Sequence, residues 1–100
     1  LDQNEWGPLH FAGKNGKNNI ISLLLSDSST NPNIEVEGET LLYWAANTGN
    51  SHIVSLLLSD TRTDPNIPNM NERTPLFAAC ANNCTDSVKC LLADKKTDPN

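Results

Sequence analysis

Cysteine and histidine are the residue types in this 100-residue chain that could support catalysis or metal binding. Cys80, Cys84 and Cys90 all lie in the last third, whereas the two histidines, His10 and His52, lie elsewhere. A tetrahedral zinc site needs four converging ligands, and the cysteines form a group of three without a CxxC spacing. The chain also lacks a Ser/His/Asp set, a phosphate-binding glycine loop and paired catalytic carboxylates in one plausible pocket. We therefore expect no enzyme activity, no catalytic residues, no metal and no cofactor.

The number of cysteines also indicates a compartment. Three is an odd number, which does not suit a framework of disulfides. Reduced thiols are typical of intracellular proteins, so we expect an intracellular, cytoplasmic location. An enzyme or redox site built on these cysteines is the least favoured interpretation of function.

Three alternating glutamates, Glu35, Glu37 and Glu39, are the most distinctive charged feature. In an extended arm, alternate side chains share a face, so the three carboxylates are expected to line up. They could form an acidic strip for a basic partner, or a solvated arm that prevents edge-to-edge strand pairing. The net charge is −5, and the chain has no basic stripe. We therefore expect no binding to nucleic acid or to an anionic membrane surface. No apolar run approaches the roughly 20 residues that cross a bilayer.

Three similar stretches, at residues 7–12, 40–45 and 74–79, define the organisation of the chain. Thr74 followed by Pro75 is typical of a helix start, because threonine caps free backbone N–H groups and proline suits the first helical position. The stretches begin 33 and 34 residues apart, and a fixed period in this range predicts a repeat array. We expect one domain over residues 1–100, with repeats at about 2–34, 35–68 and 69–100.

Each repeat is predicted to contain two helices joined by a tight turn. In the first repeat the helices are expected at about residues 8–15 and 18–26, with Gly16 between them. Gly49 and Asn83 stand at the same place in the later repeats, and both residue types reach the left-handed backbone conformation that such a turn needs. The second helix of each repeat carries apolar residues at i, i+3 and i+4, which predicts one buried stripe.

The chain resembles the ankyrin repeat family over essentially its whole length. Residues 74–76 match the Thr-Pro-Leu start of the family pattern, and residues 8–10 match its Pro-Leu-His. Gly49 matches the glycine turn, and residues 53–58 match the Ile-Val-x-Leu-Leu-Leu second helix. The resemblance implies an all-α solenoid of stacked helix-turn-helix units joined by β-hairpin-like loops. The sequence departs from the pattern at Glu5 and Glu72, where Gly38 keeps the hairpin glycine, and at Tyr43 and Phe77, where His10 keeps the histidine.

The resemblance also implies a function, which is binding to another protein on the concave surface of the hairpin loops and first helices. The glutamate run suggests that this partner has a basic patch. Trp44 could serve either as core packing or as an anchor for the partner. The main alternative is a structural spacer inside a long ankyrin array, with no partner of its own. The implied loop residues are Gln3, Asn4, Trp6, Val36, Glu37, Glu39, Met70, Asn71 and Arg73; the implied helix residues are Lys14, Asn15, Trp44, Asn47, Thr48, Ala81 and Asn82.

The apolar stripe of the last repeat carries a further expectation. A helix pair of this size cannot bury its apolar face alone, and stacked neighbours must cover it. The third repeat keeps Val88, Leu91 and Leu92, so we expect further ankyrin repeats of the same chain beyond Asn100. Cys80 and Cys90 align with core positions and are expected to pack as small hydrophobic residues.

Two possible modification sites stay open. Cys84 aligns with polar residues in the other repeats and is expected to be exposed. The resemblance further places Asn33, Asn66 and Asn100 where asparaginyl hydroxylases act on ankyrin repeats. A purely structural role for these asparagines is the favoured alternative.

Overall fold

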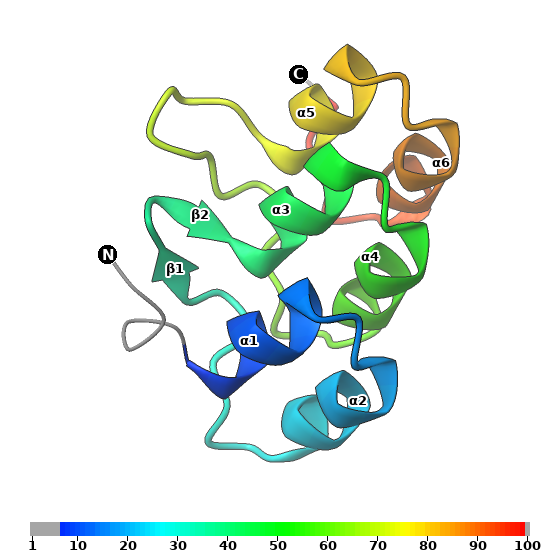
Figure 1. The fold of residues 1–100 in the computed structure, drawn as a ribbon. Coiled ribbons are helices and arrows are strands. Elements are labelled where there is room, and N and C mark those ends of the chain that lie inside the picture. The colour runs from blue at the N-terminus through cyan, green and yellow to red at the C-terminus, as the bar shows by residue number, and fades with distance from the viewer. Residues whose placement is uncertain (1–6, 100) are drawn as a thin grey trace.

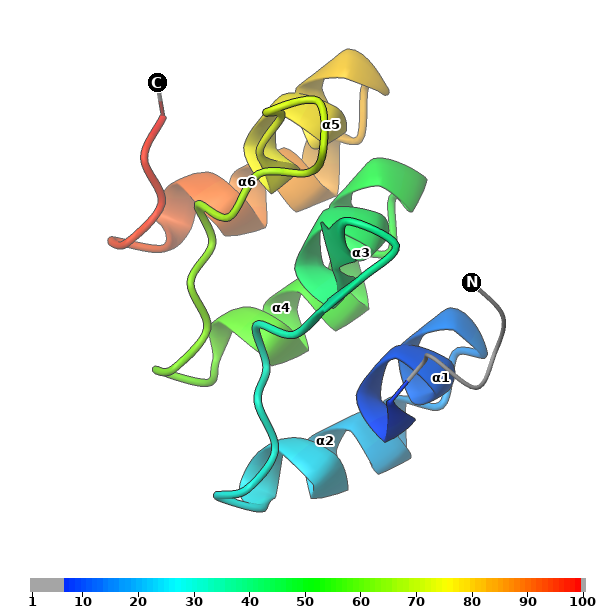
Figure 2. The same ribbon diagram turned by 90° about the vertical axis from the view of Figure 1, so that its left-hand side faces the viewer.

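The computed structural model describes residues 7–99 of the chain, and within that range the helices form three stacked pairs. The first helices of the pairs lie in one layer and the second helices in another, as the two views show (Figure 1, Figure 2). This is the all-α stack of helix-turn-helix units that the sequence predicts. The helices are α1 (Pro8–Lys14), α2 (Asn18–Ser26), α3 (Leu41–Thr48), α4 (Ser51–Leu58), α5 (Pro75–Ala81) and α6 (Thr85–Ala93).

The helix starts follow from local capping. The Oγ1 of Thr40 accepts a hydrogen bond from the backbone N–H of Tyr43 at 3.1 Å. The Oγ1 of Thr74 accepts the equivalent bond from Phe77 at 3.3 Å, and Pro75 takes the first helical position. Each threonine thus satisfies one N–H group that the helix itself leaves without a partner. These starts confirm the prediction made from the sequence.

The turns between paired helices also follow the prediction. Gly16, Gly49 and Asn83 have φ values of 68°, 79° and 58°, which is the left-handed region that glycine and asparagine enter most readily. The residue after each turn donates its N–H back to the first helix, as Asn50 does to the Ala45 carbonyl at 2.8 Å. The same local chemistry therefore builds each of the three corners.

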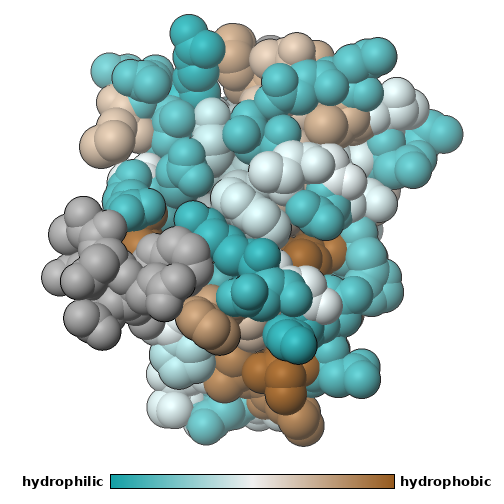
Figure 3. Space-filling view, in the orientation of Figure 1, coloured by the Kyte–Doolittle hydropathy of each residue, from teal (hydrophilic) through white to brown (hydrophobic). Residues whose placement is uncertain are grey.

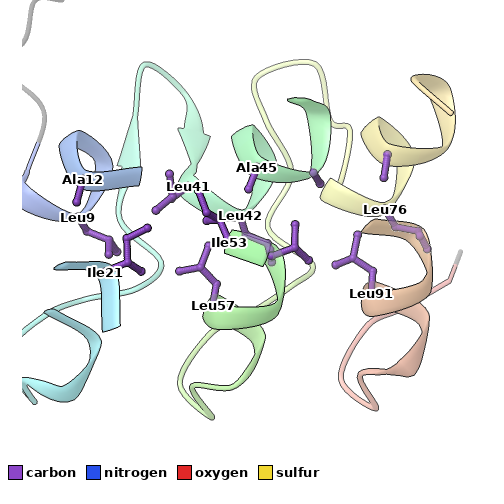
Figure 4. Packing of buried hydrophobic residues seen from close by; sticks show 13 residues of the cluster. Leu9, Ala12, Ile21, Leu41, Leu42, Ala45, Ile53, Leu57, Leu76 and Leu91 are labelled. Atoms are coloured by element: carbon purple, nitrogen blue, oxygen red, sulfur yellow. The ribbon is translucent and has the colours of Figure 1, made fainter. Parts of the chain in front are cut away.

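The core is a thin layer between the helix rows rather than a central ball. Leucine, isoleucine and alanine side chains from all three pairs meet in one continuous cluster (Figure 4). The α1 and α3 helices approach each other closely, because a Cβ built at Gly13 would lie 2.5 Å from Leu41 Cδ1. Small residues at this position let neighbouring pairs pack against each other, and the stacking buries surface that one pair could not bury alone.

A short antiparallel strand pair precedes α3. The strands are β1 (Glu35–Val36) and β2 (Glu39–Thr40), with Glu35 paired to Thr40 and Val36 paired to Glu39. Glu37 and Gly38 form the connecting turn, and both have positive φ, at 56° and 80°. Two positive values in a two-residue connection are typical of a tight hairpin whose twist matches the strands.

The second loop, at residues 69–73, is not a strand pair, although it occupies the equivalent place before α5. The Asn69 N–H donates to the Arg73 carbonyl at 2.9 Å, and the Asn69 side-chain oxygen accepts from the N–H groups of Asn71 and Arg73. Glu72 takes a φ of 62° without being glycine. An asparagine side chain therefore organises this loop in place of paired strands.

Among the described residues, no helix combines the length and the apolar character needed to cross a membrane.

Candidate partner-binding surface

The candidate surface comprises the two described loops and the exposed residues of α1, α3 and α5. The loops project from the layer of first helices and away from the layer of second helices (Figure 1, Figure 2). Gln3, Asn4 and Trp6, which the sequence places at the tip of a preceding loop, lie outside the described residues.

The glutamate run does not form one acidic strip. Residues directly opposite each other in a strand pair share a face, so Glu39 shares a face with Val36, and Glu35 shares the other with Thr40. Glu37 lies in the turn itself. The expectation of three aligned carboxylates is therefore wrong, because the chain reverses direction within the run.

The loop residues differ in what they offer to a partner. Val36 is only 5% exposed, so its side chain cannot contact a partner, and the prediction is corrected at this residue. Glu37 is exposed and Glu39 is partly exposed. The Met70 side chain lies over Gly38, where an added Cβ would collide with Met70 Cγ, yet Met70 remains 78% exposed. The methionine is thus both packed against the first hairpin and open to solvent.

Arg73 is held beside an aromatic ring on the same surface. Its guanidinium carbon lies 4.8 Å from the centroid of the Phe77 ring, within the range of a cation–π contact. Phe77 is itself about half exposed. An arginine positioned in this way loses less side-chain freedom when a partner binds.

Polar side chains on the first helices form a connected row. The amide nitrogen of Asn82 on α5 donates to the backbone oxygen and to the side-chain oxygen of Asn47 on α3, at 3.1 and 2.7 Å. Asn15 and Thr48 each donate to a carbonyl of their own helix, at 2.8 and 2.9 Å. Four of the predicted residues therefore have fixed orientations. Ala81 is exposed, whereas Lys14 and Trp44 are partly buried.

A model of the ankyrin repeat family, with three copies of the repeat, matches residues 9–100. The chain belongs to the ankyrin repeat family. Ankyrin repeats are in general protein–protein interaction modules and are typically not enzymes. The search of curated proteins found no match.

The cysteines of these ankyrin repeats differ from the expectation. Cys80 is exposed, although it aligns with the buried residues Gly13 and Ala46. No further helix pair covers it within the described residues, which is why the prediction of a core position is wrong. Cys84 and Cys90 are partly buried and pack at the edge of the core, so Cys84 is less open than expected. Across residues 7–99 no group of three or more His, Cys, Asp or Glu residues could hold a metal ion.

One contact network in the ankyrin stack escaped the sequence analysis. Arg62, in the loop after α4, donates to the carbonyls of Leu25, Ser28 and Thr30 after and at the end of α2, at 3.0, 3.2 and 2.7 Å. Asp60 holds the arginine with a 2.7 Å ion pair. This hydrogen-bonded pair is the main reason why the pKa of Asp60 lies below its usual value. The only sequence signal was a basic residue at the same place in the third repeat, Lys96.

Asparagines bridge successive pairs in the same region. The Asn33 side chain donates to the Arg62 carbonyl and accepts from the Asp64 N–H, at 2.9 and 2.7 Å. Asn66 makes the equivalent two bonds to Lys96 and Asp98. These bonds give the asparagines a structural role, and their hydroxylation stays a prediction.

His10 links the first two pairs of the ankyrin stack and is expected to make it sensitive to acid. Its Nε2 lies 3.3 Å from the Glu39 carbonyl, and its Nδ1 is buried without a partner in the described part of the chain. Burial is the main reason why the pKa of His10 lies below 6.5; the Glu39 bond opposes this and the Lys14 charge adds to it. Because the folded pKa lies below the unfolded value, the stabilising contribution is complete above about pH 6.5 and is lost as the pH falls.

The prediction is a fall in the free energy of unfolding between about pH 7.5 and pH 5. His10→Tyr should flatten this fall, because Tyr43 occupies the equivalent place in the second repeat with only 6% exposure. Urea denaturation at several pH values measures both. His52→Gln, at an exposed position on α4, is the control and should keep the fall. A pH dependence that survives His10→Tyr unchanged would contradict the assignment.

Proposed function

We propose that these ankyrin repeats bind a partner protein through the exposed residues of the two loops and of α1, α3 and α5. The observation that carries the proposal is the second loop, which presents Met70, Asn71 and Arg73 to solvent in a fixed backbone conformation. Methionine and arginine are enriched in interface cores. An ordered loop loses little conformational entropy when it docks.

The charge of the loops favours a partner with a basic patch. Glu35, Glu37 and Glu72 are exposed, and Arg73 is the only cation in residues 35–39 and 69–73. These carboxylates do not share one face, so they favour a basic partner through their combined field rather than as an aligned strip. The same charge disfavours nucleic acid and anionic membranes as partners.

The location follows from the same proposal. The thiols of Cys80, Cys84 and Cys90 are free, and free thiols suit a reducing compartment. We place the binding function inside the cell, in the cytoplasm.

The experiment is a selection of binders from a displayed peptide library on the wild-type protein. The variant Met70→Ala/Asn71→Ala/Arg73→Ala should weaken most selected binders about tenfold or more, because anchor residues carry most of the binding energy. Its far-UV circular dichroism should be unchanged. Ser55→Ala/Lys89→Ala is the control, because both residues are exposed on the second-helix layer. Binders that ignore the loop variant would favour the alternative function, a structural spacer.

The glutamates require a separate measurement. Glu35→Gln/Glu37→Gln should slow the association of basic binders and weaken its dependence on salt. Unchanged association rates at low and high salt would remove the basic patch from the proposal and leave the loop contact intact.

A further inference from the structure

The far end of the stack, at α5 and α6, exposes residues that the other pairs bury. Phe77 is 48% exposed, whereas the equivalent residues His10 and Tyr43 are 1% and 6% exposed. Leu92 is 56% exposed, and Cys80 is exposed as well. We call Phe77, Cys80 and Leu92 the end face. In the first two pairs the same positions are covered by the next pair, so the end face has the form of one half of an interface that the molecule already makes twice.

Each of those two internal interfaces includes a cation. Arg62 donates to the carbonyls of Ser28 and Thr30, at 3.2 and 2.7 Å. Lys96 donates to the equivalent carbonyls of Thr61 and Thr63, at 3.1 and 2.8 Å. In both cases a basic side chain of one repeat reaches back to two carbonyl oxygens of the preceding loop. Hydrogen bonds from a charged donor are stronger than neutral ones, so this cation contributes to the choice of neighbour.

The third repeat offers the same two acceptors without a donor. The equivalent carbonyls belong to Lys95 and Thr97, and no side chain within residues 7–99 donates to them. The end face and this pair of oxygens lie on the same repeat. Together they present the apolar surface and the acceptors that α1–α2 and α3–α4 offer to their neighbours.

A second copy of this chain does not supply the missing donor. Its first repeat has Ser29 at the place of Arg62 and Lys96, and that hydroxyl already donates to Asp27 at 2.8 Å. A serine is too short to reach back to another loop as Arg62 does. The first pair does expose apolar surface, with Phe11 and Ile20 at 47% and 46%, and apolar side chains gather at that lower end of the molecule (Figure 3).

We propose that the end face docks a further ankyrin-type helix pair, carried by a separate polypeptide, whose loop has lysine or arginine at the place of Arg62 and Lys96. The apolar contact supplies affinity, and the cation selects this partner over a second copy of the chain. This surface is distinct from the loops that the proposed function uses, so the two proposals can fail separately.

The test converts the protein into its own probe. Ser29→Arg places a cation at the required position, next to Asp27, just as Arg62 lies next to Asp60. Leu92→Glu in the same probe blocks its own end face and so prevents growth into longer assemblies. Binding of this probe to immobilised wild-type protein should be about tenfold tighter than binding of a probe with Leu92→Glu alone.

Two controls decide the outcome. A probe with Ser29→Ala and Leu92→Glu should show no gain, and Phe77→Glu in the immobilised protein should abolish the gain. Phe77 is about half exposed, so this variant should keep its helical circular dichroism; Leu92→Glu in the immobilised protein serves if it does not. Equal binding of the arginine and alanine probes would overturn the proposal. A gain that persists with a blocked end face would also overturn it, because the cation would then act elsewhere.

Discussion

Leu57→Ala should lower the free energy of unfolding by about 2–5 kcal/mol, the usual cost of a cavity left by a buried leucine. Leu57 lies on α4, in the middle pair, and is fully buried. A repeat stack is stabilised by its interfaces as much as by its separate units. The α4 helix contacts both α2 and α6, so the cavity weakens the helix that joins the two outer pairs.

Urea denaturation followed by circular dichroism measures this change. Leu23→Ala is the matched control, because the substitution is the same and Leu23 is 67% exposed on α2. The control should stay within about 0.5 kcal/mol of the wild type. Similar losses for both variants would contradict the view that the continuous core holds the pairs together.

Replacing the two bridging asparagines should have the next largest effect. Asn33→Ala removes one donor and one acceptor that join the loop after α2 to the loop after α4. Asn66→Ala does the same between the loops after α4 and α6. Each variant leaves backbone groups without their partner, which costs about 1–3 kcal/mol where water cannot replace it. The double variant should lose close to the sum, because the two bridges lie in different loops.

Asn71→Ala is the control for the asparagines. Asn71 is exposed at the tip of the second loop, so its loss should change the free energy of unfolding by no more than about 0.5 kcal/mol. Hydrogen exchange adds a local measurement, since Asn33→Ala should speed exchange at the Asp64 N–H specifically. Exchange at Asp64 that stays as slow as in the wild type would show that the bridge does not persist in solution.

The corners and helix starts could be predicted from the sequence because they depend on neighbouring residues alone. Thr40 and Thr74 cap the helices that they precede, and Gly16, Gly49 and Asn83 take the left-handed conformation, as expected. Capping and positive φ are settled within a few residues. Similarly, the repeat period was sufficient to predict the stacked helix pairs.

The acidic run shows where local reasoning failed. Alternation along an extended arm is a sound rule for one strand, but the chain turns at Glu37 and Gly38. The turn sends Glu39 back along the opposite strand, beside Val36. The position of the reversal, and not the spacing of the glutamates, decides which face each carboxylate takes.

The amino-acid sequence by itself determined the helices, their turns and the family of this protein, because these follow from residue types at short, repeated spacings. Only the tertiary structure decided that Tyr43 is buried while Phe77 and Cys80 are exposed at equivalent or core-like positions. It also showed that Arg62 reaches back to Ser28 and Thr30. Burial and long side-chain contacts depend on which surface lies opposite, and that surface belongs to residues about 30 positions away in the chain.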